Sequence, residues 1–120
     1  MNPQEISTPN EYGVFVDGVE ILEFFGKHSK AKIRCVFTRE GWRGNFEADF
    51  WENPARGISG SPSLHCSPYP TKELCISSVC ALMRTFCLTD GNRHPKGQKE
   101  LLAWLEAQDP ARPHQLSLFD

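Results

Sequence analysis

Two consecutive stretches of this sequence alternate between apolar and polar residues with a period of two, and they constrain the fold more than any other feature. The first stretch spans 31–38 and the second spans 42–51. Their apolar or small positions are Ala31, Ile33, Cys35 and Phe37 in the first stretch and Trp42, Gly44, Phe46, Ala48 and Phe50 in the second. Because side chains alternate between the two faces of a strand, this period predicts two strands that each bury one face. The short link between them predicts an antiparallel pair.

A second hairpin is predicted upstream of these two strands. The dipeptide Asp17-Gly18 stands between two apolar runs, which is the strongest short-range indication of a tight β-hairpin. We therefore expect strands at 12–16 and 19–26. The alternation breaks after Ile21, so a bulge near Glu23 or burial on both faces of the second strand is expected.

The next segment predicts a loop and then a helix. Residues 53–70 are rich in proline, glycine and serine, which predicts a long irregular connection. A helix is predicted over 74–87, with Thr71 as its N-cap. At about 100° per residue, one broad apolar arc of this helix holds Cys75, Ile76, Val79, Cys80, Leu82, Met83, Phe86 and Cys87.

A second helix is predicted over 95–108, because Pro95 suits the first helical position and Asp109-Pro110 stops the helix. Its expected buried stripe is Leu101, Leu102 and Leu105. The predicted fold class is therefore α+β, a four-stranded antiparallel meander packed by two C-terminal helices. The predicted organisation is a flexible N-terminus at 1–10, a single α+β domain at 11–108 and a flexible, proline-containing tail at 109–120.

The size and charge of the chain narrow the classes of protein to which it can belong. A chain of 120 residues fits one domain with a real core. The net charge of −2 provides no overall basic field that would attract nucleic acid or a membrane surface. The sequence has no apolar run long enough to span a bilayer, and the polar first ten residues lack a signal-peptide pattern. The sequence therefore predicts a cytoplasmic protein with no membrane partner.

The chain contains five cysteines, which are Cys35, Cys66, Cys75, Cys80 and Cys87. In a cytoplasmic protein they are expected to stay reduced. The sequence lacks the paired spacings that are typical of zinc sites, so neither a metal nor another cofactor is predicted. A metal site made by His65, Cys66, Cys75 and His94 is an alternative. Burial as small apolar residues explains the three helix cysteines more simply.

The segment from Lys27 to Arg43 suggests a nucleic-acid interface. Basic groups could hold phosphates and a ring could stack on a base, and the candidate residues are Lys27, Lys30, Arg39, Trp42 and Arg43. Strand pairing argues against this interpretation. If Arg39-Glu40 form the turn, the cross-strand pairs are Lys30–Asp49 and Lys32–Glu47; a turn two residues longer gives Lys32–Asp49 and Arg34–Glu47. Either register neutralises the cations on the exposed face, so direct nucleic-acid binding is not favoured.

The sequence predicts no enzymatic activity. Glu47 and Asp49 share a strand face, which suits acid–base or metal chemistry, but pairing with the lysines opposite explains them more simply. His65 and Cys66 are adjacent, so their side chains point apart on an extended backbone. A nucleophile with a base and an orienting group is not apparent.

The most specific motif is the C-terminal stretch Gln115-Leu116-Ser117-Leu118-Phe119. It follows a segment in which Pro110 and Pro113 oppose a helix. An apolar cluster in this setting either docks on its own domain or binds another protein. All five residues resemble the peptide with which bacterial replication and repair proteins bind the DNA sliding clamp, the beta subunit of polymerase III. The resemblance implies that Gln115 is a polar anchor at the mouth of a pocket, that Leu116 fills one apolar subsite, and that Leu118 and Phe119 fill the main one.

The resemblance implies a small, non-enzymatic accessory or inhibitor protein that docks on the sliding clamp. Its size would suit a protein of a phage or other mobile element. The body would act on a second replication or repair protein or as a steric block. One alternative is an interaction or inhibitor module whose tail completes its own fold or a dimer. Another is a nucleic-acid-binding domain that uses the hairpin from Lys27 to Arg43.

Overall fold

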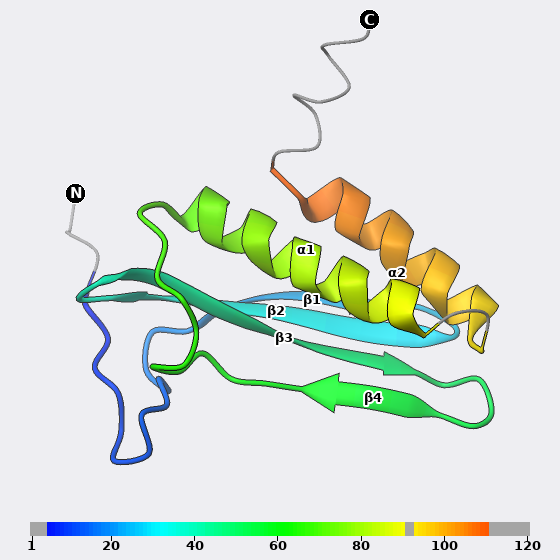
Figure 1. Ribbon diagram of the computed structural model, residues 1–120, viewed down its shortest axis with the longest axis horizontal. Coiled ribbons are helices and arrows are strands. Elements are labelled where there is room, and N and C mark those ends of the chain that lie inside the picture. The colour runs from blue at the N-terminus through cyan, green and yellow to red at the C-terminus, as the bar shows by residue number, and fades with distance from the viewer. Residues whose placement is uncertain (1–4, 91–92, 111–120) are drawn as a thin grey trace, which may run out of the picture.

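The protein is an α+β fold in which two helices cover one face of a four-stranded antiparallel sheet (Figure 1). The computed structural model describes residues 5–90 and 93–110. The elements are β1 (Glu20–Phe25), β2 (Ser29–Thr38), β3 (Gly41–Phe50), β4 (Arg56–Ser59), α1 (Lys72–Thr89) and α2 (Pro95–Gln108). Each strand pairs with its neighbour in chain order, so the sheet is a meander. The predicted fold class is confirmed, and the predicted flexible tail lies outside the described residues.

The hairpin of β2 and β3 forms the centre of the sheet and follows the predicted alternation. Arg39 and Glu40 make the two-residue turn between the strands. This turn sets the first of the two predicted registers, in which Lys30 faces Asp49 and Lys32 faces Glu47. The apolar side of both strands faces the helices, and Ile33, Ala48 and Phe50 are fully buried there.

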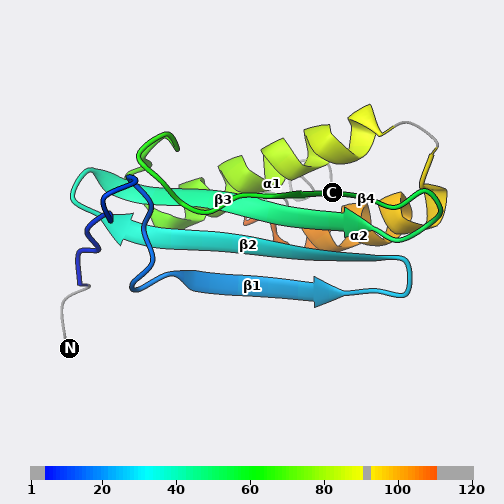
Figure 2. The same ribbon diagram turned by 90° about the horizontal axis from the view of Figure 1, so that it is seen from below.

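The predicted strand at 12–16 is wrong, although Asp17-Gly18 does form a turn. The segment pairs with the loop after β4 instead: the Phe15 N–H donates to the Pro62 carbonyl at 3.0 Å. Phe15 is only 3% exposed there, and pairing beside β1 would have left it at the sheet edge. The N-terminal segment instead lies across one end of the sheet on the face without helices (Figure 2), and the Ser7 N–H donates to the Phe37 carbonyl at 2.8 Å.

The fourth strand lies in the stretch that was predicted to be irregular. β4 pairs with the last part of β3, from Glu47–Ser59 to Phe50–Arg56. The strand is only four residues long, and the prolines and glycines around it hide the period of two on which the prediction depended. Neither alternative expected for 19–26 occurs: β1 pairs with β2 residue by residue without a bulge near Glu23, and the exposed Ile21 and Phe25 show that the strand is not buried on both faces.

The core lies between the helices and the sheet. It is formed by buried side chains of β2, β3, α1 and α2, namely Ala31, Ile33, Phe46, Ala48, Phe50, Val79, Cys80, Met83, Cys87, Leu101 and Leu105. Beside this core, Phe24 of β1 stacks on Trp104 of α2 with ring centroids 5.7 Å apart. Within residues 5–90 and 93–110, neither helix is long and apolar enough to cross a membrane.

The predicted helices are confirmed, with α1 two residues longer at each end. Thr71 caps α1, since its hydroxyl accepts a hydrogen bond from the Leu74 N–H at 3.1 Å. The apolar arc of α1 is narrower than predicted. Leu82 was expected inside it, but its side chain is 56% exposed.

Candidate functional site

The sliding-clamp motif, Gln115 to Phe119, lies outside the described residues, but the structure describes the point from which this tail leaves the body. Helix α2 ends at Gln108, and the Asp109 N–H donates to the Leu105 carbonyl at 2.9 Å. The Asp109 carboxylate accepts a hydrogen bond from the Arg84 guanidinium of α1 at 3.4 Å. These contacts hold the base of the tail against both helices.

The face of the sheet without helices carries a network of ion pairs, which we call the open-face ion network: Glu23, Lys30, Lys32, Arg34, Glu47 and Asp49. Lys30 Nζ lies 3.4 Å from a Glu47 oxygen and 3.7 Å from an Asp49 oxygen. The Arg34 guanidinium donates to Glu47 at 3.0 Å, and this hydrogen bond lowers the pKa of Glu47. Lys32 Nζ lies 3.9 Å from Glu23. The three cations therefore pair with three carboxylates and leave little unmatched charge for phosphates, although Lys32 pairs with Glu23 of β1 and not with Glu47, the residue opposite it on β3.

The candidate nucleic-acid residues do not form one patch. Lys27 lies in the turn before β2 and Arg39 in the turn after it, and a ten-residue strand separates such turns by about 30 Å. Lys30 belongs to the open-face ion network. The half-buried Trp42 ring contacts Phe37, with centroids 5.4 Å apart. The basic side chains and the Trp42 ring therefore do not form one continuous surface that could bind a nucleic acid.

The fifth candidate, Arg43, is a buried structural residue. It is 6% exposed, and its guanidinium donates to the carbonyls of Leu64 at 3.2 Å and Cys66 at 2.5 Å. It also pairs with Glu40 at 3.2 Å. Arg43 therefore ties the irregular loop 60–70 to β3, and the geometry does not favour a role for it in binding phosphate.

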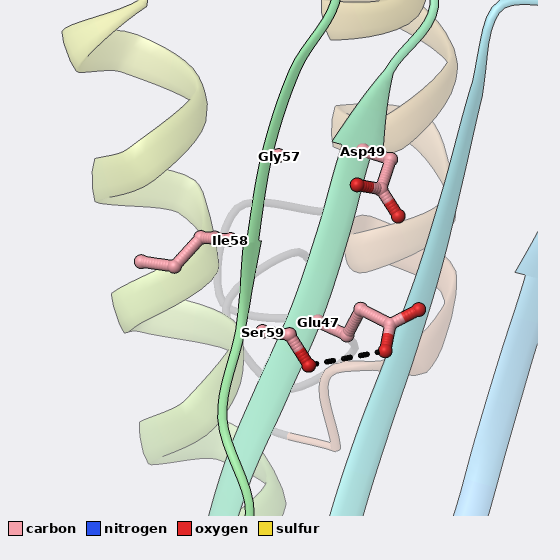
Figure 3. A pocket seen from close by; sticks show the side chains of 5 residues that line it. All are labelled: Glu47, Asp49, Gly57, Ile58 and Ser59. Atoms are coloured by element: carbon pink, nitrogen blue, oxygen red, sulfur yellow. Dashed lines mark hydrogen bonds between the residues drawn. The ribbon is translucent and has the colours of Figure 1, made fainter.

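The two carboxylates of β3 line a shallow hollow of about 400 Å³ beside β4 (Figure 3). Ser59 donates to Glu47 at 3.2 Å, and Ile58 points away toward the α1 side. Because both carboxylates already pair with cations of β2, this hollow lacks a free acid or base. No group of three or more potential metal ligands occurs among the described residues, so His65, Cys66, Cys75 and His94 do not converge on a metal there.

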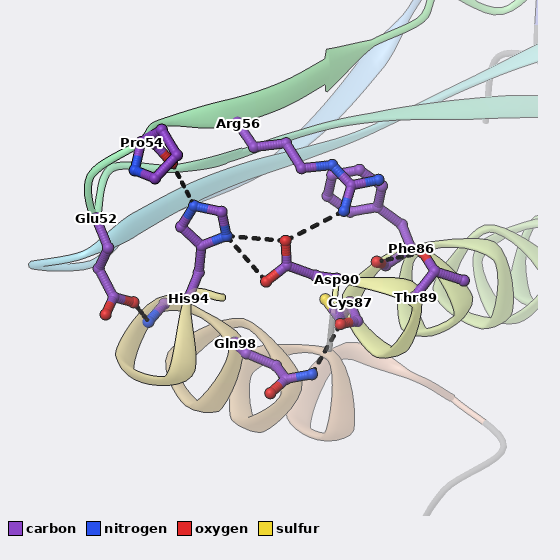
Figure 4. Close-up of polar contacts among 10 residues, drawn as sticks. Glu52, Pro54, Arg56, Phe86, Cys87, Thr89, Asp90, His94 and Gln98 are labelled. Atoms are coloured by element: carbon purple, nitrogen blue, oxygen red, sulfur yellow. Dashed lines mark hydrogen bonds and ion pairs between the residues drawn. The ribbon is translucent and has the colours of Figure 1, made fainter. Parts of the chain in front are cut away.

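A polar cluster that the sequence did not indicate lies where α1 ends and α2 begins (Figure 4). We call it the buried His94 network: Pro54, Arg56, Asp90 and His94. His94 Nδ1 lies 2.8 and 2.9 Å from the two Asp90 oxygens, and Nε2 lies 2.5 Å from the Pro54 carbonyl oxygen. The Pro54 carbonyl can only accept, so Nε2 carries a proton; the lowered pKa of Asp90 keeps its carboxylate ionised, so Nδ1 also donates and the ring is cationic.

The surroundings of the ring support this charge state. Its hydrogen bond to the Pro54 carbonyl and its pairing with Asp90 raise the pKa of His94, against the effect of burial. Burial opposes ionisation of Asp90, but hydrogen bonds from His94 and Arg56 outweigh it and lower the pKa of Asp90. Glu52 also faces this end of α2 and accepts the Gly97 N–H at 2.8 Å. The network therefore joins the loop after β3, β4 and both helices.

Only one feature of the sequence could have indicated this network, the spacing of four residues between Asp90 and His94. The other two members come from 34 and 40 residues away, a separation that local patterns do not report. Every polar group of the network has a partner, and His94 and Asp90 are 1% and 2% exposed. Such a cluster holds elements together and does not present a reactive group.

The cysteines differ sharply in their access to solvent. Burial raises the pKa of Cys35 to about 11 and the pKa of Cys75, Cys80 and Cys87 to about 12 each. Cys66 is half-buried and lines an open cleft of about 330 Å³ between the loop before α1 and α1 itself.

We expect one thiol per native chain to react quickly with a disulfide reagent, because only Cys66 combines access with a position outside the core. The four other thiols should react only after unfolding in urea. Absorbance of the released thiolate measures both phases. The variant Cys66→Ser should lose the fast phase alone, and two or more fast thiols in the native parent would contradict the assignment.

Comparison of the chain with protein-family models, with curated proteins and with solved structures gives no match.

Proposed function

We propose that this chain binds the bacterial DNA sliding clamp through Gln115 to Phe119 and acts as a non-enzymatic accessory or inhibitor protein in DNA replication or repair. The observation that carries the proposal is the match of all five residues to the clamp-binding peptide. In this proposal Gln115 is the polar anchor, Leu116 fills one subsite, and Leu118 and Phe119 fill the main pocket. The protein would work in the bacterial cytoplasm, encoded by the host or by a mobile element.

The architecture of the body is consistent with a tail that serves a partner. The core cluster is built from side chains between Ala31 and Leu105, and Leu101 and Leu105 are fully buried in it. The tail begins beyond this core, at the Arg84–Asp109 contact. Because the described residues already form a core, we expect the three large apolar side chains of the motif to serve a pocket on another protein.

The short connection to the motif favours a blocking role. Five residues lead from Pro110 to Gln115, and an extended chain spans at most about 3.6 Å per residue, so the reach is about 18 Å. A bound motif would therefore hold the folded body close to the clamp surface. There the body would obstruct the approach of larger clamp partners, or would offer its own surface to a second replication or repair protein.

Removal of the tail after His114 is expected to abolish clamp binding and to leave the urea midpoint of the body unchanged. The expected midpoint follows from the core that the described residues already form between the sheet and the helices. If the tail were instead docked on the body, its loss would cost roughly 1.5–3 kcal/mol per large side chain. That is a large part of a total stability of about 5–15 kcal/mol.

Titration calorimetry with purified clamp and urea denaturation followed by circular dichroism measure the two results. The full chain carrying Ser117→Ala is the matched control and should keep both properties. A plain fall in the midpoint would favour a module whose tail completes its own fold. Absence of clamp binding by the unmodified chain would end the proposal.

A further inference from the structure

The outward face of α1 is apolar and uncharged. Leu74, Leu82 and Leu88 are 51%, 56% and 61% exposed, and Ala81 and Thr85 are also exposed between them. Single exposed leucines are ordinary, but a continuous apolar patch on a surface marks an interaction site. Of the described surfaces of the two helices, this face of α1 is therefore the strongest candidate for an interaction site.

The exposed residues form a stripe that follows the helix axis. At about 100° per residue, Leu74, Ala81 and Leu88 lie within about 40° of one another, and the exposed Thr85 lies beside them. Ser78 is half-buried and hydrogen-bonds the Tyr69 hydroxyl, so it is not part of this exposed surface. We call Leu74, Ala81, Thr85 and Leu88 the α1 stripe; the exposed Leu82 lies about 100° around the helix from Ala81 and flanks it. Its centre is opposite Met83, which is fully buried against the sheet, so the stripe points directly away from the core.

Helix α2 lies in the same layer and provides an internal comparison. Its outward residues include Lys96, Lys99 and Glu106, which are exposed. The solvent-facing side of α2 thus has the charges expected of a surface helix, whereas the α1 stripe has none. The charged residue of α1 nearest to the centre of the stripe is Arg84, which pairs with Asp109 on the α2 side.

We propose that the α1 stripe binds a second copy of this chain, with the two α1 helices antiparallel. The stripe is symmetric about Ala81, because Leu74 and Leu88 each lie seven residues from it. A two-fold interface requires such self-complementarity. Leu74 of one copy packs on Leu88 of the other, and the two Ala81 residues meet at the axis. Small side chains near the axis allow close approach of the helices, and the contact buries no charge of the stripe.

The expected dimer is weak. A helix of 18 residues is about 27 Å long, and with a width of about 10–12 Å its face covers about 300 Å². A standard stable interface buries about 800 Å² per partner. We therefore expect a dissociation constant of about 100 µM to 1 mM for the dimer, so the protein is mostly monomeric at low concentration.

Charge substitutions at the axis test the proposal. Sedimentation equilibrium of the full chain from 10 µM to 1 mM, concentrations chosen to span the range expected for a face of this size, should show a rise from monomer toward dimer mass. Ala81→Glu and Ala81→Lys should each weaken association at least tenfold, because like charges would meet at the axis. An equal mixture of the two variants should restore it as a heterodimer. Ala103→Glu, an exposed alanine of α2, is the matched control and should associate like the parent.

Several results would overturn the proposal. These are a full chain that stays monomeric at 1 mM, an Ala81 variant that associates like the parent, and a mixture of variants without recovery. Association that appears only after removal of the tail beyond His114 would show that the tail, not a second copy, covers the stripe. Circular dichroism melts verify that each variant is folded, so that loss of association reports on the interface.

Discussion

Alanine at both Leu118 and Phe119 is expected to abolish binding to the sliding clamp, whereas alanine at Ser117 should change the affinity little. A few buried anchors dominate the binding energy of a short peptide. Each large apolar side chain contributes roughly 1.5–3 kcal/mol when fully buried. Loss of both therefore weakens binding by about two to four orders of magnitude, since each 1.4 kcal/mol is tenfold.

Titration calorimetry of purified clamp with the full chain measures this effect, and the isolated peptide 111–120 should bind on its own. Competition between this peptide and the full chain tests whether both occupy the same pocket. A double-alanine chain that binds as tightly as the parent would show that the body, and not the motif, makes the contact.

Replacement of His94 by alanine is expected to lower the free energy of unfolding by about 3–5 kcal/mol, the typical cost of removing one partner from a buried ion pair. The variant leaves the Asp90 carboxylate in the core with Arg56 as its remaining cation, and it leaves the Pro54 carbonyl without its partner. It also opens a space against Phe50, whose ring stacks on His94 with centroids 5.1 Å apart. Urea denaturation at pH 6 measures the loss.

The matched control for this variant is His65→Ala. His65 is exposed, so its removal should change stability by no more than about 0.5 kcal/mol. A loss of less than about 1 kcal/mol for His94→Ala would contradict the view that the buried His94 network holds the two helices to the β3–β4 loop.

The pH dependence of stability tests the charge of the ring. The pKa of His94 is raised above its ordinary value of 6.5. The side chain therefore stabilises the folded protein fully below pH 6.5, and this stabilisation is lost as pH rises through the pKa of His94 in the folded state. The pKa of Asp90 is lowered from 3.8, so its contribution is present above that pH and is lost in acid as pH falls through its folded pKa. The stability difference between the parent and His94→Ala should therefore shrink on the alkaline side. A constant difference up to pH 10 would contradict a cationic ring.

The parts of the fold that depend on local pattern could be predicted from the sequence. The alternation in 31–38 and 42–51 was sufficient for the central hairpin but left two registers open, and the structure has the one in which Lys30 faces Asp49. The turn at Asp17-Gly18 was also correct, but its hairpin was not. A turn fixes a local change of direction, while burial of Phe15 against the loop at Pro62 decides where the strand before it lies.

Neither β4, which lies within the 53–70 loop, nor the buried His94 network could be predicted from a local pattern. The four residues of β4 are stabilised by the free edge of β3, a partner that a window of sequence does not contain. The buried His94 network likewise joins residues that become neighbours only after both helices have packed. The structure does not describe the five residues of the clamp motif, so their role remains a prediction from the motif itself.

The order of the elements along the chain has a consequence for biosynthesis. Each strand pairs with the one made just before it, so the sheet can form early and without closing long loops. The helices that cover the sheet are made last. Until α1 has emerged from the ribosome, the apolar face with Ile33 and Phe46 has no cover, and nascent chains that stall in the 53–70 loop would be the form most prone to aggregate.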